Sequence, residues 1–69
     1  MTIVDSRGTL CPQPIIDLAR SVKRAVPGET ITLLSDDLAT WPDLQAWSRM
    51  TSHTVKRIDQ FTFEIIISA

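Results

Sequence analysis

The chain has few of the side chains that cross-link or metallate small domains. It contains one cysteine and one histidine in 69 residues. A single cysteine cannot form an internal disulfide, and one cysteine with one histidine cannot complete a zinc site without ligands from another chain. We therefore expect no structural metal, no disulfide and no cofactor, so that the hydrophobic core alone must hold the fold.

Long apolar segments and clusters of basic residues are also missing. Nowhere do 18 apolar residues follow one another, and the first five residues lack a basic region followed by an apolar run. Seven Lys and Arg balance eight Asp and Glu, and the chain has two glycines. These counts argue against direct nucleic-acid binding and against a glycine-rich phosphate loop. We expect a cytoplasmic protein, in which a thiol stays reduced.

The composition that remains is that of a small folded domain. Hydrophobic residues make up 43% of the chain and charged residues 22%, which is ordinary for a globular protein. A chain of this length buries only about 60% of the surface that it exposes when unfolded. We expect residues 1–69 to form a single, marginally stable domain.

Hydrophobic periodicity predicts strands on either side of a first helix. Residues 2–5 are a short β-prone run, and residues 29–35 have the composition of a central strand buried on both faces. From Ile15 onward, apolar side chains recur at positions 15, 18, 19, 22 and 26, which is the spacing of one helix face. Pro27-Gly28 predicts the end of this helix.

The second half of the chain predicts another helix and then a hairpin. Residues 40–43 have a capping pattern that begins with the Thr40 hydroxyl, and Leu44, Trp47 and Met50 are expected on the inner face. The position of Trp41 stays open. Residues 54–68 alternate in polarity as two strands do, with a turn near Asp59-Gln60. The order βαβαββ predicts an α/β fold, a two-layer sandwich with two helices on one face of a four-stranded mixed sheet.

The only cysteine stands in the segment Leu10-Cys11-Pro12-Gln13-Pro14, immediately before the first predicted helix. Proline suits the first turn of a helix, so Pro12 is expected at its first position and Pro14 within that turn. The free amide groups and the dipole at a helix start favour an anion, which lowers the pKa of a cysteine thiol. The same field would suit a persulfide anion, and without a second cysteine the captured sulfur would have to pass to a partner.

The alternative for Cys11 is an unreactive role in the core. Free cysteine is among the most buried residue types and commonly serves as a small hydrophobic side chain. Spacing and composition alone leave both interpretations open.

The flanking segments add a family resemblance that covers almost the whole chain. The chain resembles the TusA (SirA-like) family of small sulfur-carrier proteins in a Cys-Pro-x-Pro motif and three flanking segments: Cys11-Pro12-Gln13-Pro14, Asp5-Ser6-Arg7-Gly8, Pro27-Gly28-Glu29 and Asp36-Asp37-Leu38-Ala39-Thr40. It departs from the family pattern at Leu38, where proline is common.

This resemblance implies a sulfur relay in which Cys11 carries sulfur as a persulfide. It implies a cysteine desulfurase or a rhodanese as donor, and a downstream sulfur-relay protein as acceptor, in tRNA thiolation, cofactor synthesis or sulfur metabolism. It also implies possible partner contacts at Asp36 and Asp37, and docking on a membrane transporter remains open. The residues do not distinguish sulfur from selenium.

Other charged residues have weaker functional signals. Arg7 is a candidate to hold a thiolate or a partner, although a solvated loop arginine is more common. Asp36 and Asp37 follow a strand and have the character of turn and cap residues. Arg20, Lys23 and Arg24 form a basic helix face. The competing function is a non-catalytic regulatory or interaction domain with the same fold, in which Cys11 is buried and slow to alkylate.

Overall fold

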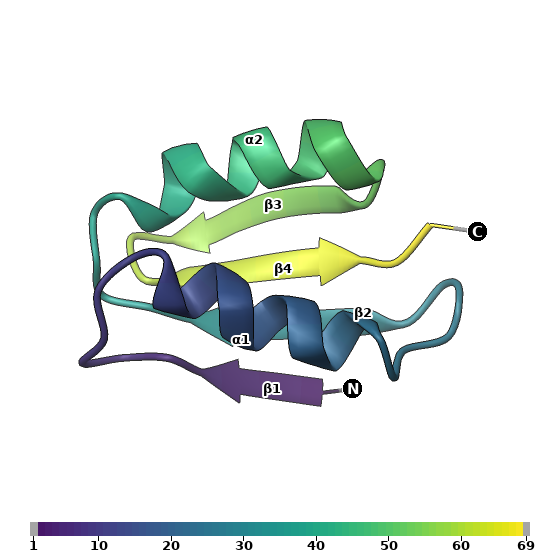
Figure 1. The fold of residues 1–69 in the computed structure, drawn as a ribbon, viewed down its shortest axis with the longest axis horizontal. Helices are drawn as coiled ribbons and strands as arrows, with labels where there is room; N and C mark the ends of the chain where they lie inside the picture. The colour runs from purple at the N-terminus through teal and green to yellow at the C-terminus, as the bar shows by residue number, and fades with distance from the viewer. Residues whose placement is uncertain (1, 69) are drawn as a thin grey trace.

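A four-stranded sheet carries both helices on one face in the computed structural model, which describes residues 2–68 (Figure 1). The elements in chain order are β1 (Thr2–Asp5), α1 (Gln13–Val22), β2 (Thr30–Leu34), α2 (Thr40–Thr51), β3 (Thr54–Asp59) and β4 (Thr62–Ile66). The strand order is β1-β2-β4-β3, with β1 parallel to β2 and the other two pairs antiparallel. The predicted two-layer α/β sandwich with a mixed sheet is confirmed.

The core lies between the helix layer and the two central strands. Ile31 pairs with Ile65 and Leu33 with Phe63 across β2 and β4, and all four side chains are buried. They share the core with residues from α1, α2 and the C-terminal segment, namely Leu18, Leu44 and Ile67. Alternation along each central strand therefore sends every second side chain into one core.

The expectation that β2 is buried on both faces is wrong. Its burial alternates, with Ile31 and Leu33 buried and the intervening threonine and leucine residues partly exposed. The reason is that both helices cover the same face of the sheet, as Figure 1 shows, so the opposite face has no second layer. The predicted central position of this strand is confirmed by its place between β1 and β4.

The first helix ends earlier than its apolar stripe predicts. It stops at Val22, and Val26 lies outside it with 63% of its surface exposed. Gly28 adopts a positive φ of 88°, and its amide donates to the carbonyl of Ile67. The chain therefore leaves the helix to dock beside the end of β4, which the spacing of apolar residues did not reveal.

The second helix also differs in detail from the prediction. Ala39 occupies the N-cap position without a side-chain cap, so the predicted capping role of Thr40 is wrong. Leu44 is buried, whereas Met50 is 83% exposed and does not face the core. Trp41 stacks on Phe63 with ring centroids 5.8 Å apart, which resolves its role as partly buried packing.

The hairpin follows the predicted pattern with two exceptions. Phe63, Ile65 and Ile67 are buried as alternation predicts, but Phe61 falls in the turn and is partly exposed. Ile58 is also exposed, and it lies at the register shift between Arg57 and Asp59. This irregularity interrupts the alternation at the end of β3.

Parallel pairing of β1 with β2 places the loops that follow them at the same edge of the sheet. Both loops lie at the left of Figure 1, where each leads into a helix. The amide of Ser6 donates to the carbonyl of Leu34 at 2.8 Å, which extends the pairing beyond β1. The loop that contains Cys11 is therefore held next to the loop that starts α2.

Replacement of Leu44 by alanine tests whether α2 depends on this core. Leu44 is fully buried, so Leu44→Ala is expected to lower the free energy of unfolding by about 2–5 kcal/mol. Met50→Ala, on an exposed position of the same helix, is the control and should change it by less than about 0.5 kcal/mol. Urea denaturation measures both, and equal effects of the two substitutions would contradict this core.

Candidate functional site

Cys11 is held in place by a carboxylate from the neighbouring loop. The backbone amide of Cys11 donates to Oδ2 of Asp37 at 2.6 Å, and the amide of Ala39 donates to Oδ1 of the same side chain at 3.0 Å. These two amide hydrogen bonds lower the pKa of Asp37 below its usual value. The Asp37 side chain thus joins the loop that contains Cys11 to Ala39, the residue at the N-cap position of α2.

The two prolines of the motif flank the start of α1. Pro12 occupies the N-cap position and Pro14 the second helical position, so the prediction of Pro12 as the first helical residue is wrong by one. Pro14 lies in the first turn as predicted, where it is buried, and Pro12 is exposed. The peptide bond between Cys11 and Pro12 is cis.

The thiol itself contacts one buried hydroxyl group, which in turn contacts a second. Sγ of Cys11 lies 3.6 Å from Oγ1 of Thr40, and that oxygen lies 2.6 Å from Oγ of Ser35. Ser35 and Thr40 have no exposed surface, whereas Cys11 is partly exposed. The sulfur therefore lies against the buried hydroxyl of Thr40, while Cys11 as a residue keeps part of its surface exposed.

The pKa of the Cys11 thiol is raised, so the expectation of a lowered value is wrong. Burial is the main cause, the interaction with Thr40 acts in the opposite direction, and Asp43 and Asp37 raise the value further. The helix start does not supply free amides to the sulfur. The amide of Gln13 donates to the carbonyl of Leu10, and the next two amides donate to the carbonyl of Pro12.

The remaining predicted residues, Asp36 and Arg7, make different contacts. Asp36 accepts the amide of Gly8 through both carboxylate oxygens, at 3.0 and 3.2 Å, and so holds the two loops together as Asp37 does. Arg7 instead forms an ion pair with Asp5 at 2.8 Å, which lowers the pKa of Asp5 to about 2. The predicted partner roles of Arg7, Asp36 and Asp37 stay predictions.

An apolar groove runs beside Cys11 between the two helices. It has a volume of about 260 Å³ and is lined by Pro12, Ile15, Asp43, Ala46, Trp47 and Met50. Leu10 and Leu38, from the two adjoining loops, are 79% and 72% exposed. Sequence reasoning missed this groove because Met50 was assigned to the core.

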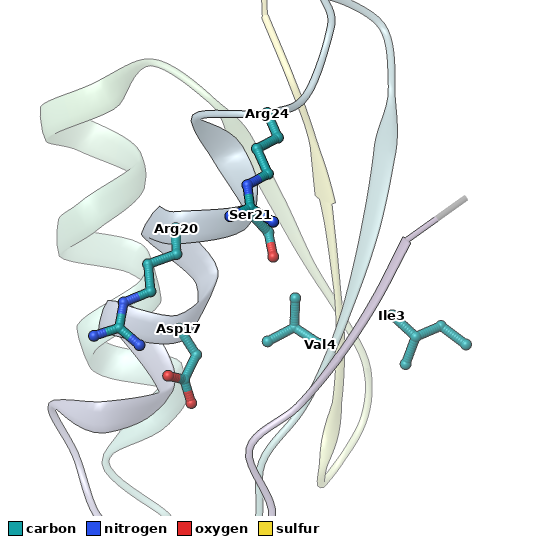
Figure 2. A pocket seen from close by; sticks show the side chains of 6 residues that line it. All are labelled: Ile3, Val4, Asp17, Arg20, Ser21 and Arg24. Atoms are coloured by element: carbon teal, nitrogen blue, oxygen red, sulfur yellow. The ribbon is translucent and has the colours of Figure 1, made fainter.

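A second hollow lies between α1 and the edge strand β1 and is more polar (Figure 2). Its volume is about 330 Å³, and its lining residues are Ile3, Val4, Asp17, Arg20, Ser21 and Arg24. Asp17 accepts hydrogen bonds from Ser6 and Gln13, at 2.8 and 2.7 Å. Two arginines of the predicted basic face therefore border this hollow, while the groove beside Cys11 lies on the side of α1 that faces α2.

Metal-binding clusters and membrane-spanning helices are both missing from the described part of the chain. Residues 2–68 contain no group of three or more His, Cys, Asp or Glu side chains placed to hold a metal ion. Within the same residues, neither helix has the length and apolar character needed to cross a membrane.

Comparison with known proteins supports the resemblance on which the site was predicted. The family described as "Sulfurtransferase TusA" matches residues 2–69. A protein of Archaeoglobus fulgidus named "Putative sulfur carrier protein" is 29% identical over 58 residues, covering 84% of this chain and 80% of its own. The crystal structure of a SirA-like protein from Desulfitobacterium hafniense matches all of both chains with a TM-score of 0.82 at 19% identity, which shows the shared fold.

The carboxylate of Asp43 provides a test of the electrostatics around the thiol. Because Asp43 raises the pKa of Cys11, Asp43→Asn is expected to lower that pKa. The measurement is the pH dependence of alkylation by iodoacetamide. Glu64→Gln serves as the control, because Glu64 stands between the buried Phe63 and Ile65 on β4 and so points to the other face of the sheet. An unchanged or raised midpoint in Asp43→Asn would contradict the assignment.

Proposed function

The chain belongs to the TusA sulfurtransferase family of sulfur carriers, and we propose that it carries sulfur as a persulfide on Cys11. The observation that carries this proposal is the place of the only cysteine. Cys11 is partly exposed at the junction of two loops and stands beside an apolar groove. Its sulfur is thus held on a fixed backbone and remains open to another protein.

The transfer needs no oxidant or metal. The thiolate of Cys11 attacks the outer sulfur of a donor persulfide, the sulfur–sulfur bond of the donor breaks, and the donor leaves as a thiolate. An acceptor thiolate then attacks the outer sulfur on Cys11 and displaces the Cys11 thiolate in the same way. The chain has no second cysteine to intercept this persulfide as an internal disulfide, which suits a carrier.

The partners in this proposal are proteins. A cysteine desulfurase or a rhodanese supplies the sulfur, and a downstream relay protein accepts it for tRNA thiolation, cofactor synthesis or sulfur metabolism in the cytoplasm. The apolar groove that includes Pro12, next to Cys11 in the chain, supports a protein partner, as do the exposed side chains of Leu10 and Leu38 in the two adjoining loops, because exposed apolar surface is typical of an interaction site. The net charge of −1 gives no support to nucleic acid as the direct partner.

A second candidate function is a regulatory or interaction domain that does not transfer sulfur. The raised pKa of Cys11 favours it, because a larger share of the thiol is then protonated and unreactive at neutral pH. In this alternative the same groove binds a partner and the cysteine contributes only to packing. The two functions differ in whether sulfur is ever found on Cys11.

Sulfur loading distinguishes the two functions. The reduced protein is incubated with a cysteine desulfurase and cysteine, or with a rhodanese and thiosulfate, and its intact mass is recorded. We expect a gain of one sulfur atom that dithiothreitol reverses, because a thiolate captures sulfane sulfur. Cys11→Ser, which retains size and polarity, should gain nothing.

Two outcomes would contradict sulfur carriage by Cys11. One is the absence of any mass gain with donors that load another carrier under the same conditions. The other is an equal gain in Cys11→Ser, which would place the sulfur elsewhere. Slow alkylation of Cys11 together with the first outcome would favour the interaction domain.

A further inference from the structure

The hydroxyl of Thr40 joins two interactions inside the protein. Its oxygen lies 2.6 Å from Oγ of Ser35 and 3.6 Å from Sγ of Cys11, and the longer distance suits sulfur because sulfur is larger than oxygen. Both hydroxyl residues are fully buried. Ser35 follows β2 directly and Thr40 is the first residue of α2, so two elements of the fold fix this pair.

We propose that Thr40 is the hydrogen-bond donor that stabilises Sγ of Cys11 as an anion, and that Ser35 positions the Thr40 hydroxyl for this task. The inference rests on the proposed function, in which Cys11 carries sulfur. Thr40 is then a catalytic residue, because it contacts Sγ of Cys11, the reacting atom. Ser35 is a positioning residue, because it acts through Thr40.

The proton count along this chain of groups favours sulfur as the acceptor. A hydroxyl has one proton to donate and two lone pairs to accept. When Ser35 donates to Thr40, the proton of Thr40 is free to point at Sγ, and both hydroxyl protons are used. In the reverse direction the thiol donates to Thr40, and Thr40 donates to Ser35. The proton of Ser35 then has no acceptor among these three groups, and a buried hydroxyl proton without an acceptor is costly.

Thr40 acts on the pKa of the Cys11 thiol in the opposite direction to the other groups that face it. Asp37, from the loop after β2, and Asp43, from the first turn of α2, both disfavour the thiolate, as does burial. On the side of α1, the first turn contains no acidic residue, and its amides are taken by the carbonyls of Leu10 and Pro12. The hydroxyl of Thr40 is thus the group in contact with Sγ whose interaction favours the anion.

This placement matters most when sulfur leaves the protein. The acceptor thiolate bonds to the outer sulfur, the bond between the two sulfurs of the persulfide breaks, and the electron pair of that bond remains on Sγ of Cys11. The leaving group is therefore the Cys11 thiolate, and a lower pKa of the leaving thiol speeds such exchange. A hydroxyl already aimed at Sγ stabilises the charge as it develops.

The test removes the hydroxyl and then restores it. Thr40→Val keeps the shape of the side chain without the proton, and Thr40→Ser keeps the proton. Two rates are measured for each protein: alkylation by iodoacetamide as a function of pH, and single-turnover transfer from the loaded persulfide to glutathione. In Thr40→Val we expect a higher alkylation midpoint and transfer slowed by about three- to ten-fold, and in Thr40→Ser values within about two-fold of the wild type.

A second apolar variant serves as the control for loss of stability. Thr40→Val leaves the buried Ser35 hydroxyl without its partner, whereas Ser35→Ala with Thr40→Val removes both partners and should fold at little cost. Thermal unfolding is recorded for each protein, and the double variant replaces the single variant in both rate measurements if the single variant does not fold. It should show the same raised midpoint and slow transfer.

The outcomes separate this inference from the proposed function. Equal alkylation midpoints and equal transfer rates in the wild type and the apolar variants would overturn the role of Thr40 while sulfur carriage stands. A wild-type protein that accepts no sulfur would overturn sulfur carriage. Alkylation still tests Thr40 in that case. Apolar variants with the same alkylation midpoint as the wild type would overturn the anion-stabilising role of Thr40, and variants with a higher midpoint would support it.

Discussion

The site depends on one carboxylate that bridges two loops. Asp37 accepts the amides of Cys11 and Ala39, at 2.6 and 3.0 Å, and so fixes the cysteine loop to the start of α2. Parallel pairing of β1 and β2 brings these loops to the same sheet edge. Asp36 supports this bridge, because it accepts the amide of Gly8 and so joins the same two loops. The Asp37 bridge is the one that reaches the backbone of Cys11 itself.

The same two loops and the start of α2 place groups with opposite effects on the pKa of the Cys11 thiol around its sulfur. Burial and the negative charges of Asp43 and Asp37 favour the protonated thiol, while the Thr40 hydroxyl favours the anion. A resting carrier gains from a protonated thiol, because unwanted oxidation and disulfide exchange proceed through the thiolate. We infer that the hydroxyl, rather than the start of α1, supplies the anion stabilisation that transfer requires.

Sequence reasoning was most successful where local pattern and tertiary environment agree. The alternation of Phe63 and Ile65 and the central place of β2 follow from polarity alone. The family resemblance rests on the Cys-Pro-x-Pro motif together with three further segments, and the family match covers residues 2–69. The raised pKa could not be predicted, because it depends first on burial in the folded protein and then on Asp43, which lies 32 positions from Cys11 along the chain. Met50 satisfied the helical spacing of core residues, yet it lines the open groove between the two helices and stays exposed there.

The central claim is that Cys11 conveys sulfur from one protein to another, and a relay with radioactive sulfur tests it most directly. A desulfurase loaded with ³⁵S is separated from a thiol acceptor by a dialysis membrane. Its pores let this small protein pass and retain the desulfurase. If Cys11 conveys sulfur, label reaches the acceptor when the wild-type protein is added and fails to do so with Cys11→Ser. Equal transfer with the two proteins, or label that stays on the wild-type protein in the presence of a competent acceptor, would contradict it.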